Sequence, residues 1–380
     1  LLGHAGVATT DIALAAMLPL ALLALDSWLT APTWRRAALL GAAIGLAALA
    51  KYSCMLFLPV MALALLVVRR PRIRWRHLPL VFCVTILVIW AGYRFETGTL
   101  ADAYHGHVDI TSQVPRVVQK PFEWFRTHVP IPAPLFLDGM ALLRFHNGVG
   151  HPAYLFGDVR TGGWWYYFPV IFFFKTPLPF LILTLCGAVI LLRRRIGVEL
   201  VAMPLALLLS VLPSAINIGV RHILPIYPLL CVVAAAGAVE LWRARRKGRI
   251  AIAALLAWMF VGVALAHPDY LAWFNEAAGA HPERIAVDSN LDWGQDIARL
   301  ARAVRKHHIE TIHVLCLTTV DFRAHGVPAE PLLPGERPKG WIAVSETALR
   351  LSADADQYRW LDHEQPVERV GRSIRLYLVR

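Results

Sequence analysis

The chain has little charge and lacks the motifs of soluble nucleotide-binding enzymes. Asp, Glu, Lys and Arg make up 17% of its 380 residues, whereas soluble domains carry about 25%. Hydrophobic residues reach 57%, and the mean hydropathy is +0.52. Neither a GxGxxG fingerprint nor a P-loop occurs. These features exclude an ordinary soluble protein and indicate a membrane protein with some soluble mass.

Cysteine is also scarce, and the sequence has only five. Four of them lie in apolar stretches and none forms a CxxC pair, which excludes a disulfide framework and a zinc signature. The chain begins Leu-Leu-Gly-His, with neither an initiating Met nor a signal peptide. We therefore expect that the true N-terminus lies upstream of residue 1.

Apolar stretches dominate the first 267 residues. A membrane-spanning helix needs roughly 20 apolar residues. The sequence predicts about eight such helices, at 11–30, 37–50, 54–68, 79–93, 178–192, 198–213, 223–242 and 250–266. The fold class is therefore an α-helical polytopic membrane protein with an extracytoplasmic C-terminal α/β domain.

The net charge of +12 comes from short basic clusters between the apolar stretches, at 31–36, 69–78, 193–197 and 243–249. With eight spans, all four clusters fall on one side, which the positive-inside rule makes cytoplasmic. Nucleic acid is thus not an expected partner. The opposite side receives the loop 94–169 and the C-terminal tail. The predicted domains are 1–267, within the membrane, and 268–380, outside the cytoplasm.

The tail reads as a small α/β domain. Strands are predicted at 284–288, 311–317, 340–345 and 373–379. Apolar residues recur at helical spacing between 293 and 306, which predicts an amphipathic helix capped by Asp292.

Two charged residues stand at the predicted outer ends of spans. Asp11 is a candidate base or ligand-holding group, or simply an acid favoured by the helix dipole. Lys51 either faces a phosphate or extends to the interface as an anchor.

The stretch 162–179, GGWWYYFPVIFFFKTPLP, places Lys175 beside eight aromatic residues. A cation in such surroundings is costly unless an anion meets it. The aromatic residues are typical of a membrane–water interface, and Tyr166 and Tyr167 are also candidates to stack on a sugar. Arg221 and His222 interrupt an apolar region on the same predicted side. Arginine binds phosphate in bidentate fashion, although an interfacial anchor or a partner for a loop carboxylate is the alternative.

No metal site is predicted. The His105, His107 and Asp109 cluster lacks further ligands at a diagnostic spacing. The segment 288–294 has only a partial likeness to a calcium loop, since its twelfth position is Arg299 rather than Glu. Participation of a divalent metal is left open.

Five stretches together resemble the bacterial polyprenyl-phosphate-sugar-dependent glycosyltransferases, the group related to protein O-mannosyltransferases and the lipid A aminoarabinose transferase. They are HAGVATTDIALA (4–15), GLAALAKYS (45–53), 162–179, NIGVRHILPIYP (217–228) and YLAWFNEAAG…VDSNLDWGQD (270–296).

This resemblance implies a sugar donor on a polyprenyl phosphate, transfer with inversion, and an active site on the outer face of the bacterial inner membrane. Asp11 matches the second acidic position of the family, and the first would lie upstream of residue 1. The sugar and the acceptor (protein, lipid or polysaccharide) are not specified.

The residues and the resemblance together define a hypothesis about mechanism. Lys51, Lys175 and Arg221 stabilise the leaving lipid phosphate, and Asp11 or the missing acid serves as the base. Arg221→Ala and Lys175→Ala are each expected to lower transfer roughly 100-fold without unfolding the protein. The alternatives are a lipid-linked sugar transporter or flippase without transfer chemistry, and a non-catalytic membrane scaffold. No internal repeat of the transporter kind is seen in the sequence.

Overall fold

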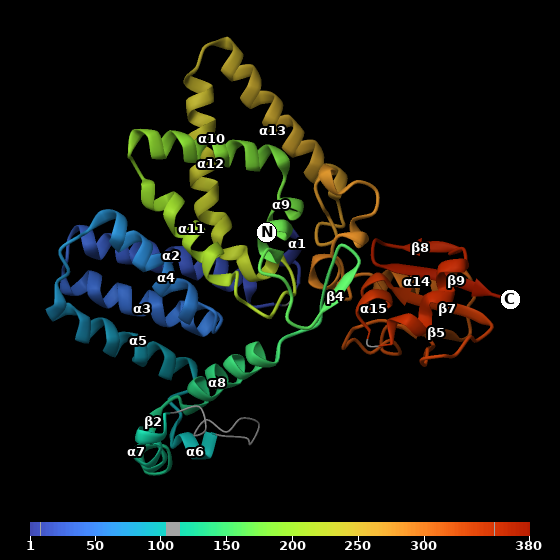
Figure 1. Ribbon diagram of the computed structural model, residues 1–380, viewed down its shortest axis with the longest axis horizontal. Helices are drawn as coiled ribbons and strands as arrows, with labels where there is room; N and C mark the ends of the chain where they lie inside the picture. Colours follow the sequence, from blue (N-terminus) through green and yellow to red (C-terminus); the bar gives the residue numbers. More distant parts are fainter. Residues whose placement is uncertain (8, 104–114, 353) are drawn as a thin grey trace.

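Two groups of helices and a C-terminal α/β domain make up the architecture (Figure 1). The computed structural model describes residues 1–7, 9–103, 115–352 and 354–380. After the short α1 (Leu2–Ala5), the first group contains α2 (Asp11–Thr30), α3 (Trp34–Ala50), α4 (Cys54–Arg69) and α5 (Leu78–Gly92). The helix α11 (Val198–Val211) packs against α4. The second group contains α10 (Leu178–Arg194), α12 (Tyr227–Arg243) and α13 (Arg246–Ala266), which contact one another.

Each of the eight segments predicted to span the membrane is largely helical. By length and composition, fewer of these helices qualify as membrane spans. Among the described residues, four helices are long and apolar enough, namely Asp11–Thr30, Trp75–Gly92, Val220–Arg243 and Arg246–Ala266. A fifth span results if α9 (Tyr167–Lys175) and α10, which meet at a bend of 113°, are counted together. The total of eight stays a prediction.

Ion pairs join the basic ends of several helices. Arg69, at the end of α4, bonds Asp26 of α2 and Glu199 at the start of α11. Arg194 of α10 bonds Glu240 of α12 through both carboxylate oxygens, at 2.8 Å each. Helix ends that the charge pattern assigned to one side are therefore neighbours in space. Which side of a membrane they occupy stays a prediction.

The predicted outer loop 94–169 contains short elements rather than a free linker. These are β1 (Thr97–Gly98), α6 (Leu100–Ala103), α7 (Arg116–His128), β2 (Ile131–Pro132), α8 (Pro134–Val149), β3 (Ala153–Leu155) and β4 (Asp158–Arg160). The hairpin of β3 and β4 contacts the segment that follows α13, where the Phe156 N–H donates to the Ile285 carbonyl at 3.0 Å. His105, His107 and Asp109 lie outside the described residues.

The α/β domain is built on one five-stranded sheet of order β6-β5-β7-β9-β8. Its strands are β5 (Ile312–Leu315), β6 (Ala329–Pro331), β7 (Gly340–Ser345), β8 (Glu368–Val370) and β9 (Ile374–Val379). β5 pairs in parallel with β6 and β7, and β9 is antiparallel to β7 and β8. The apolar face of α14 (Ile297–Lys306) covers one side of the sheet. The 3₁₀ segment η7 (Ala355–His363) covers the other, and α15 (Glu346–Leu351) follows β7 directly.

Three of the four predicted strands are confirmed, as β5, β7 and β9. The strand predicted at 284–288 is wrong. Pro282 begins the 3₁₀ turn η5 (Pro282–Arg284), and Asp288, with φ of 57°, begins η6 (Asp288–Asn290), so the backbone is not extended there.

The predicted amphipathic helix is confirmed as α14, but it begins at Ile297 and its N-cap is Asp296. Asp292 does not cap it. The Asp292 carboxylate instead accepts a hydrogen bond from the Gly294 N–H at 3.0 Å, and Gly294 has φ of 78°. The chain therefore turns at this point before the helix starts.

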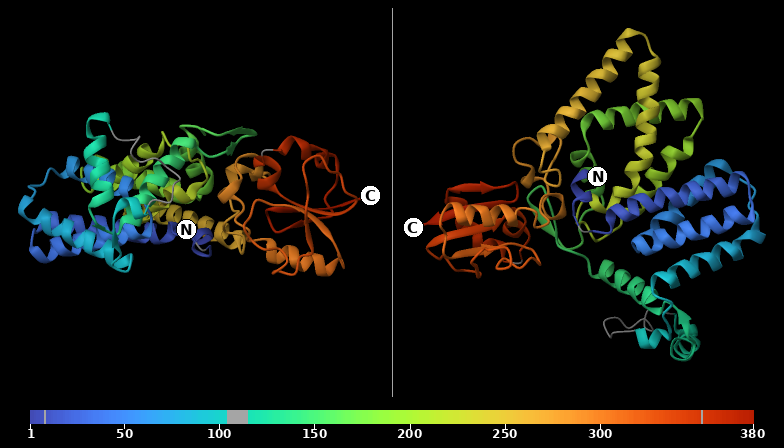
Figure 2. Two further views of the ribbon diagram at one scale, coloured as in Figure 1. Left: turned by 90° about the horizontal axis from the view of Figure 1, so that it is seen from below. Right: turned by 180° about the vertical axis from the view of Figure 1, so that it is seen from behind.

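One apolar core joins the helices to the segment 267–296, which we call the connector. Leu14, Phe168 and Ile223 from the helical part share a cluster with Val287 and Leu291 of the connector. Figure 2 shows the connector between the helices and the sheet domain in both views. The domain boundary at residue 267 stays a prediction. The connector, which follows that residue, contacts both the helices and the sheet domain.

Candidate functional site

Three charged side chains from distant parts of the sequence meet at one point. Asp11 is the first residue of α2, Lys51 follows the last residue of α3, and Arg221 lies in the 3₁₀ segment η3 (Val220–Ile226). The Lys51 ammonium bonds Asp11 Oδ1, and Arg221 Nε lies 3.2 Å from Asp11 Oδ2. We call these residues the charge cluster. It unites three of the residues that the sequence singled out.

The local fold explains why these groups converge. Asp11 lies in the first turn of α2, where the helix dipole favours a carboxylate. The backbone leaves α3 in an extended conformation at Lys51 and re-enters a helix at Cys54, so the lysine projects from a break between two helices. α2 packs against both α3 and η3, which brings the three side chains together.

The cluster is mostly buried and carries one excess positive charge. The exposed fractions of the Asp11, Arg221 and Lys51 side chains are 1%, 14% and 21%. Within the described residues, Asp11 Oδ2, Arg221 Nε and Arg221 Nη1 are buried without a hydrogen-bond partner. The contact of Arg221 with Asp11 is therefore an ion pair without hydrogen-bond geometry. Buried guanidinium N–H groups normally find acceptors, so these donors are available to an anionic ligand.

The connector supplies the opposite wall of the cluster. The Arg221 guanidinium carbon lies 4.3 Å from the centre of the Trp293 ring, a cation–π contact. The loop before Arg221 is fastened to the same segment. Ser289 donates to the Ile218 carbonyl, and the Val220 N–H donates to Asn290 Oδ1 at 3.0 Å.

Gly219 makes this close approach possible. Its φ is 133°, and a Cβ there would lie 2.5 Å from Ser289 Oγ. Sequence reasoning compared the segment 288–294 with a calcium loop and placed Trp293 in the predicted helix 293–306, so it missed the contact of this segment with Arg221. Its specific run of residues in the family resemblance was the signal that pointed to a role.

Lys175 has a different environment from the charge cluster. Its ammonium donates to the carbonyls of Leu271, Trp273 and Asn290 at 2.7, 2.5 and 2.7 Å, and it lies 4.3 Å from the centre of the Phe274 ring. An ammonium has three hydrogens, so all of them are used to bind the connector backbone. In this structure Lys175 fastens α9 to the connector.

The remaining predicted residues divide between buried and exposed positions. Tyr167 is 1% exposed, and its hydroxyl accepts a hydrogen bond from Asn290 Nδ2 at 3.1 Å. Tyr166 is 37% exposed and contacts Trp165 edge to face. His222 stacks on Phe168 with ring centres 6.1 Å apart. Tyr167 thus supports the connector, whereas Tyr166 is accessible to a ligand.

An apolar cavity of about 250 Å³ lies between α10, α12, α13 and the connector. Its lining includes Leu224, Tyr227, Trp258 and Val263, with Lys175 at one side. Leu224 belongs to η3, the segment that carries Arg221, so the cavity and the charge cluster share an element. Such a cavity accommodates hydrocarbon.

No group of three or more His, Cys, Asp or Glu side chains in the described part of the chain is arranged to hold a metal ion. The partial calcium-loop likeness at 288–294 is explained by turn geometry. There Asp288 Oδ1 accepts from the Ser289 N–H at 2.6 Å, and Asp292 accepts from Gly294.

The apolar helices indicate a multi-pass membrane protein, and the buried charge cluster lies at the ends of α2 and α3. Residues 145–314 match the family model of the Alg9-like mannosyltransferase family, which is less than half of the chain. No curated protein and no solved structure matches the chain. The matched region includes Lys175, Arg221 and Trp293 but excludes Asp11 and Lys51. The match supports a membrane glycosyltransferase that uses a lipid-linked sugar donor.

Proposed function

We propose that the protein transfers a sugar from a polyprenyl-phosphate carrier to an acceptor at the outer face of a bacterial inner membrane, as in the protein O-mannosyltransferase and aminoarabinose transferase group. The observation that carries the proposal is the charge cluster, in which Arg221 keeps buried N–H groups without acceptors beside a second cation, Lys51. A lipid phosphate would supply those acceptors. The positive-inside rule assigns the basic clusters to the cytoplasm. The charge cluster is predicted to lie at the opposite ends of the helices, which supports an outer-face position for this site.

The reaction breaks the bond between the anomeric carbon and the phosphate oxygen, and the phosphate leaves with the electron pair. Arg221 and Lys51 stabilise the negative charge that develops on it. As the phosphate takes over these cations, Asp11 loses part of its pairing and becomes a better base. It then accepts the proton of the acceptor hydroxyl or amine as that group attacks the opposite face of the sugar.

The prenyl chain needs apolar surface next to the phosphate. We assign the part of the prenyl chain nearest the phosphate to the cavity of about 250 Å³ beside η3. Tyr166, which is exposed, is the tyrosine available for stacking on the sugar. The identities of the sugar and the acceptor are not part of the proposal.

The test is a transfer assay with radiolabelled polyprenyl-phosphate sugar and protein in lipid nanodiscs. We expect Arg221→Gln to lower the rate roughly 100-fold, the typical effect of removing one electrostatic donor. Arg160→Gln is the matched control, because Arg160 also stacks on a tryptophan, Trp164, at 5.1 Å but lies outside the charge cluster.

Equal rates for Arg221→Gln and the parent protein, at equal Tm, would refute the role of Arg221. In sealed proteoliposomes, movement of the labelled lipid across the bilayer without a glycosylated product would support the transporter alternative instead.

A further inference from the structure

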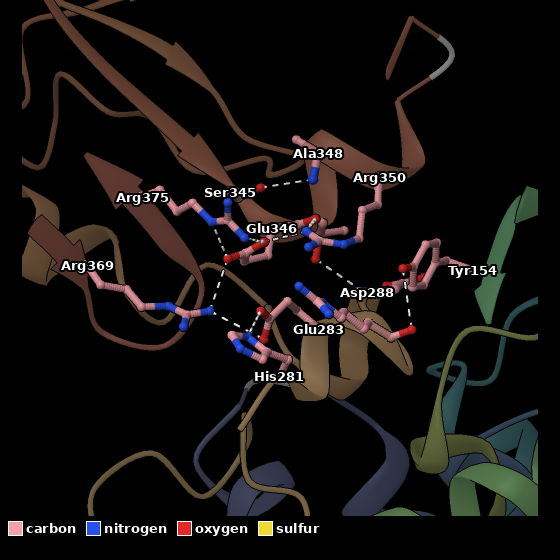
Figure 3. A network of polar contacts seen from close by, with 12 residues as sticks. Tyr154, His281, Glu283, Asp288, Ser345, Glu346, Ala348, Arg350, Arg369 and Arg375 are labelled. Atoms are coloured by element: carbon pink, nitrogen blue, oxygen red, sulfur yellow. Dashed lines mark hydrogen bonds and ion pairs between the residues drawn. The ribbon is translucent and has the colours of Figure 1, made fainter. Parts of the chain in front are cut away.

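A second charged cavity lies far along the chain from the charge cluster. It has a volume of about 590 Å³ and lies between the connector and the sheet domain. Arg284 comes from the connector, Arg350 from α15, Arg369 from β8 and Arg375 from β9. We call these four residues and the space between them the arginine pocket, and Figure 3 shows its polar contacts.

Three of the arginines converge on one carboxylate. Glu346, at the start of α15, has a side chain that is 0% exposed. Arg375 binds both of its oxygens, with Nε at 2.6 Å from Oε1 and Nη2 at 3.0 Å from Oε2. Arg350 and Arg369 bond the same carboxylate (Figure 3). The bidentate Arg375 alone neutralises the charge of the Glu346 carboxylate. Arg350 and Arg369 therefore add positive charge that Glu346 does not balance.

The connector side adds one carboxylate and one more arginine. Glu283 is 3% exposed and lies 3.4 Å from Arg369, and His281 contacts its other oxygen at 3.1 Å. Arg284 is exposed, and its guanidinium has no hydrogen bond or ion pair with any other residue that the structure describes. Asp362 also lines the space, so the carboxylates at the pocket are those of Glu283, Glu346 and Asp362. Four arginines against three carboxylates leave one positive charge in excess before His281 is protonated.

Free hydrogen-bond donors accompany this charge. Each guanidinium has five N–H donors, and the bonds to Glu346 occupy only some of those on Arg350, Arg369 and Arg375. Arginine forks match the planes of oxygen atoms on phosphate groups. The volume lies within the range of about 300–1,000 Å³ that ligand pockets have, and interfaces between structural units are common places for them.

We infer that the arginine pocket is a binding site for a phosphate group, carried either by a lipid headgroup or by a water-soluble phosphate compound. The phosphate bonds Arg284 and the free donors of Arg369 and Arg350, and Glu346 holds the arginines in position from behind. The site is independent of the proposed sugar transfer, since none of its residues belongs to the charge cluster.

The first experiment is calorimetric titration of the purified protein in detergent with inorganic phosphate at constant ionic strength. We expect saturable binding at one site, weakened tenfold to a hundredfold in Arg284→Gln, because a hydrogen bond to a charged group contributes that much. Arg284 has no side-chain partner among the described residues, so this substitution should leave Tm without phosphate unchanged. Arg359→Gln is the matched control, since Arg359 is a 76% exposed arginine of the sheet domain whose one ion-pair partner among the described residues is Asp356.

Absence of saturable phosphate binding in the parent protein would overturn the inference. So would equal weakening in Arg284→Gln and Arg359→Gln, because that result would mean general attraction to a basic surface.

A second experiment distinguishes the two sources of the phosphate group. Native mass spectrometry of the parent protein, titrated with phosphatidic acid, shows a retained lipid that Arg284→Gln lacks if the ligand is a lipid headgroup. If the two proteins retain the same lipids while only the parent binds inorganic phosphate, the ligand is water-soluble. Loss of both signals in the parent protein overturns the inference.

Discussion

The contacts of Lys175 predict that its loss weakens the attachment of the connector. Lys175→Met keeps most of the apolar stem and removes only the ammonium. Three connector carbonyls, at Leu271, Trp273 and Asn290, then lose their donor. The sequence predicted that Lys175→Ala would lower transfer through lost contact with the lipid phosphate and leave the fold intact, so this experiment separates an architectural role for Lys175 from a direct catalytic one.

The magnitude follows from the geometry. A hydrogen bond from a charged donor contributes about 1.5–3 kcal/mol, and the three are not additive because they share one ammonium. Each carbonyl left without a donor costs about 1–3 kcal/mol, and part of this loss is offset because the ammonium no longer has to be buried. We therefore expect a loss of about 4 kcal/mol, located at the connector rather than spread over the helices.

Thermal unfolding in detergent, followed by tryptophan fluorescence, measures the overall effect as a lowered Tm. Limited trypsin digestion measures the local effect, because cleavage after Arg284, whose side chain is already exposed, requires the connector backbone to detach and unfold. Thr184→Val is the matched control, since it removes a polar group from α10 that has no hydrogen-bond partner among the described residues. If Lys175→Met keeps the parent Tm and digestion pattern but loses transfer, the architectural role is refuted. Lys175 would then be assigned to direct contact with the lipid phosphate.

Three further predictions concern the connector and the loop at Gly219 that packs against it. Trp293→Ala should lower transfer between about twofold and thirtyfold, the cation–π range of about 0.5–2 kcal/mol, and Trp293→Phe should recover most of the rate; equal losses in both variants would count against a role for the ring face. Gly219→Ala should lower both Tm and transfer by more than Gly6→Ala, because its Cβ would meet Ser289 at a φ of 133° whereas a Cβ on Gly6 meets nothing within 4 Å; equal effects would contradict the close approach. Burial raises the pKa of Asp292 to about 6, so the folded state binds more protons than the unfolded state between about pH 4 and pH 6, and stability falls as the pH rises through that window. Asp292→Asn should therefore exceed the parent in stability by at most about 3 kcal/mol at pH 7.5 and match it near pH 4, and an equal Tm at pH 7.5 would contradict this.

The helices of this chain were predictable because apolar composition is a local signal. Every predicted apolar stretch is largely helical, and several helices begin or end at the basic clusters. The number of spans is less easily predicted. α4 and α11 have 16 and 14 residues, short of the roughly 20 that a span needs, and α9 bends sharply into α10.

The sheet domain shows where local signals end. The strands β5, β7 and β9 lie in short apolar stretches and were found, whereas the connector was read as partly extended. Its backbone is set by distant partners, namely Thr347 Oγ1 on the Asp288 N–H at 3.1 Å and Ile218 on Ser289. No pattern within the connector itself contains those contacts.

The charge cluster was predictable in part for a similar reason. The positive-inside rule made Lys51, Lys175 and Arg221 unusual on the predicted outer side, and that argument selected all three together. It had no means of separating Lys175, whose hydrogens are satisfied by carbonyl groups, from Arg221, whose donors are not. That distinction depends on backbone oxygens about a hundred residues away in sequence.

The arrangement around Arg221 assigns different tasks to its two neighbours. Asp11 and an incoming phosphate are both anions, so the phosphate must compete with Asp11 for the guanidinium, and the ion pair weakens as the ligand binds. Trp293 has no net charge and contacts the face of the guanidinium at 4.3 Å, leaving the N–H groups at its edge free. It therefore keeps Arg221 in position while the pairing changes. Asp11 lies near the start of the chain and Trp293 lies after α13, so the site depends on the connector as much as on the helices.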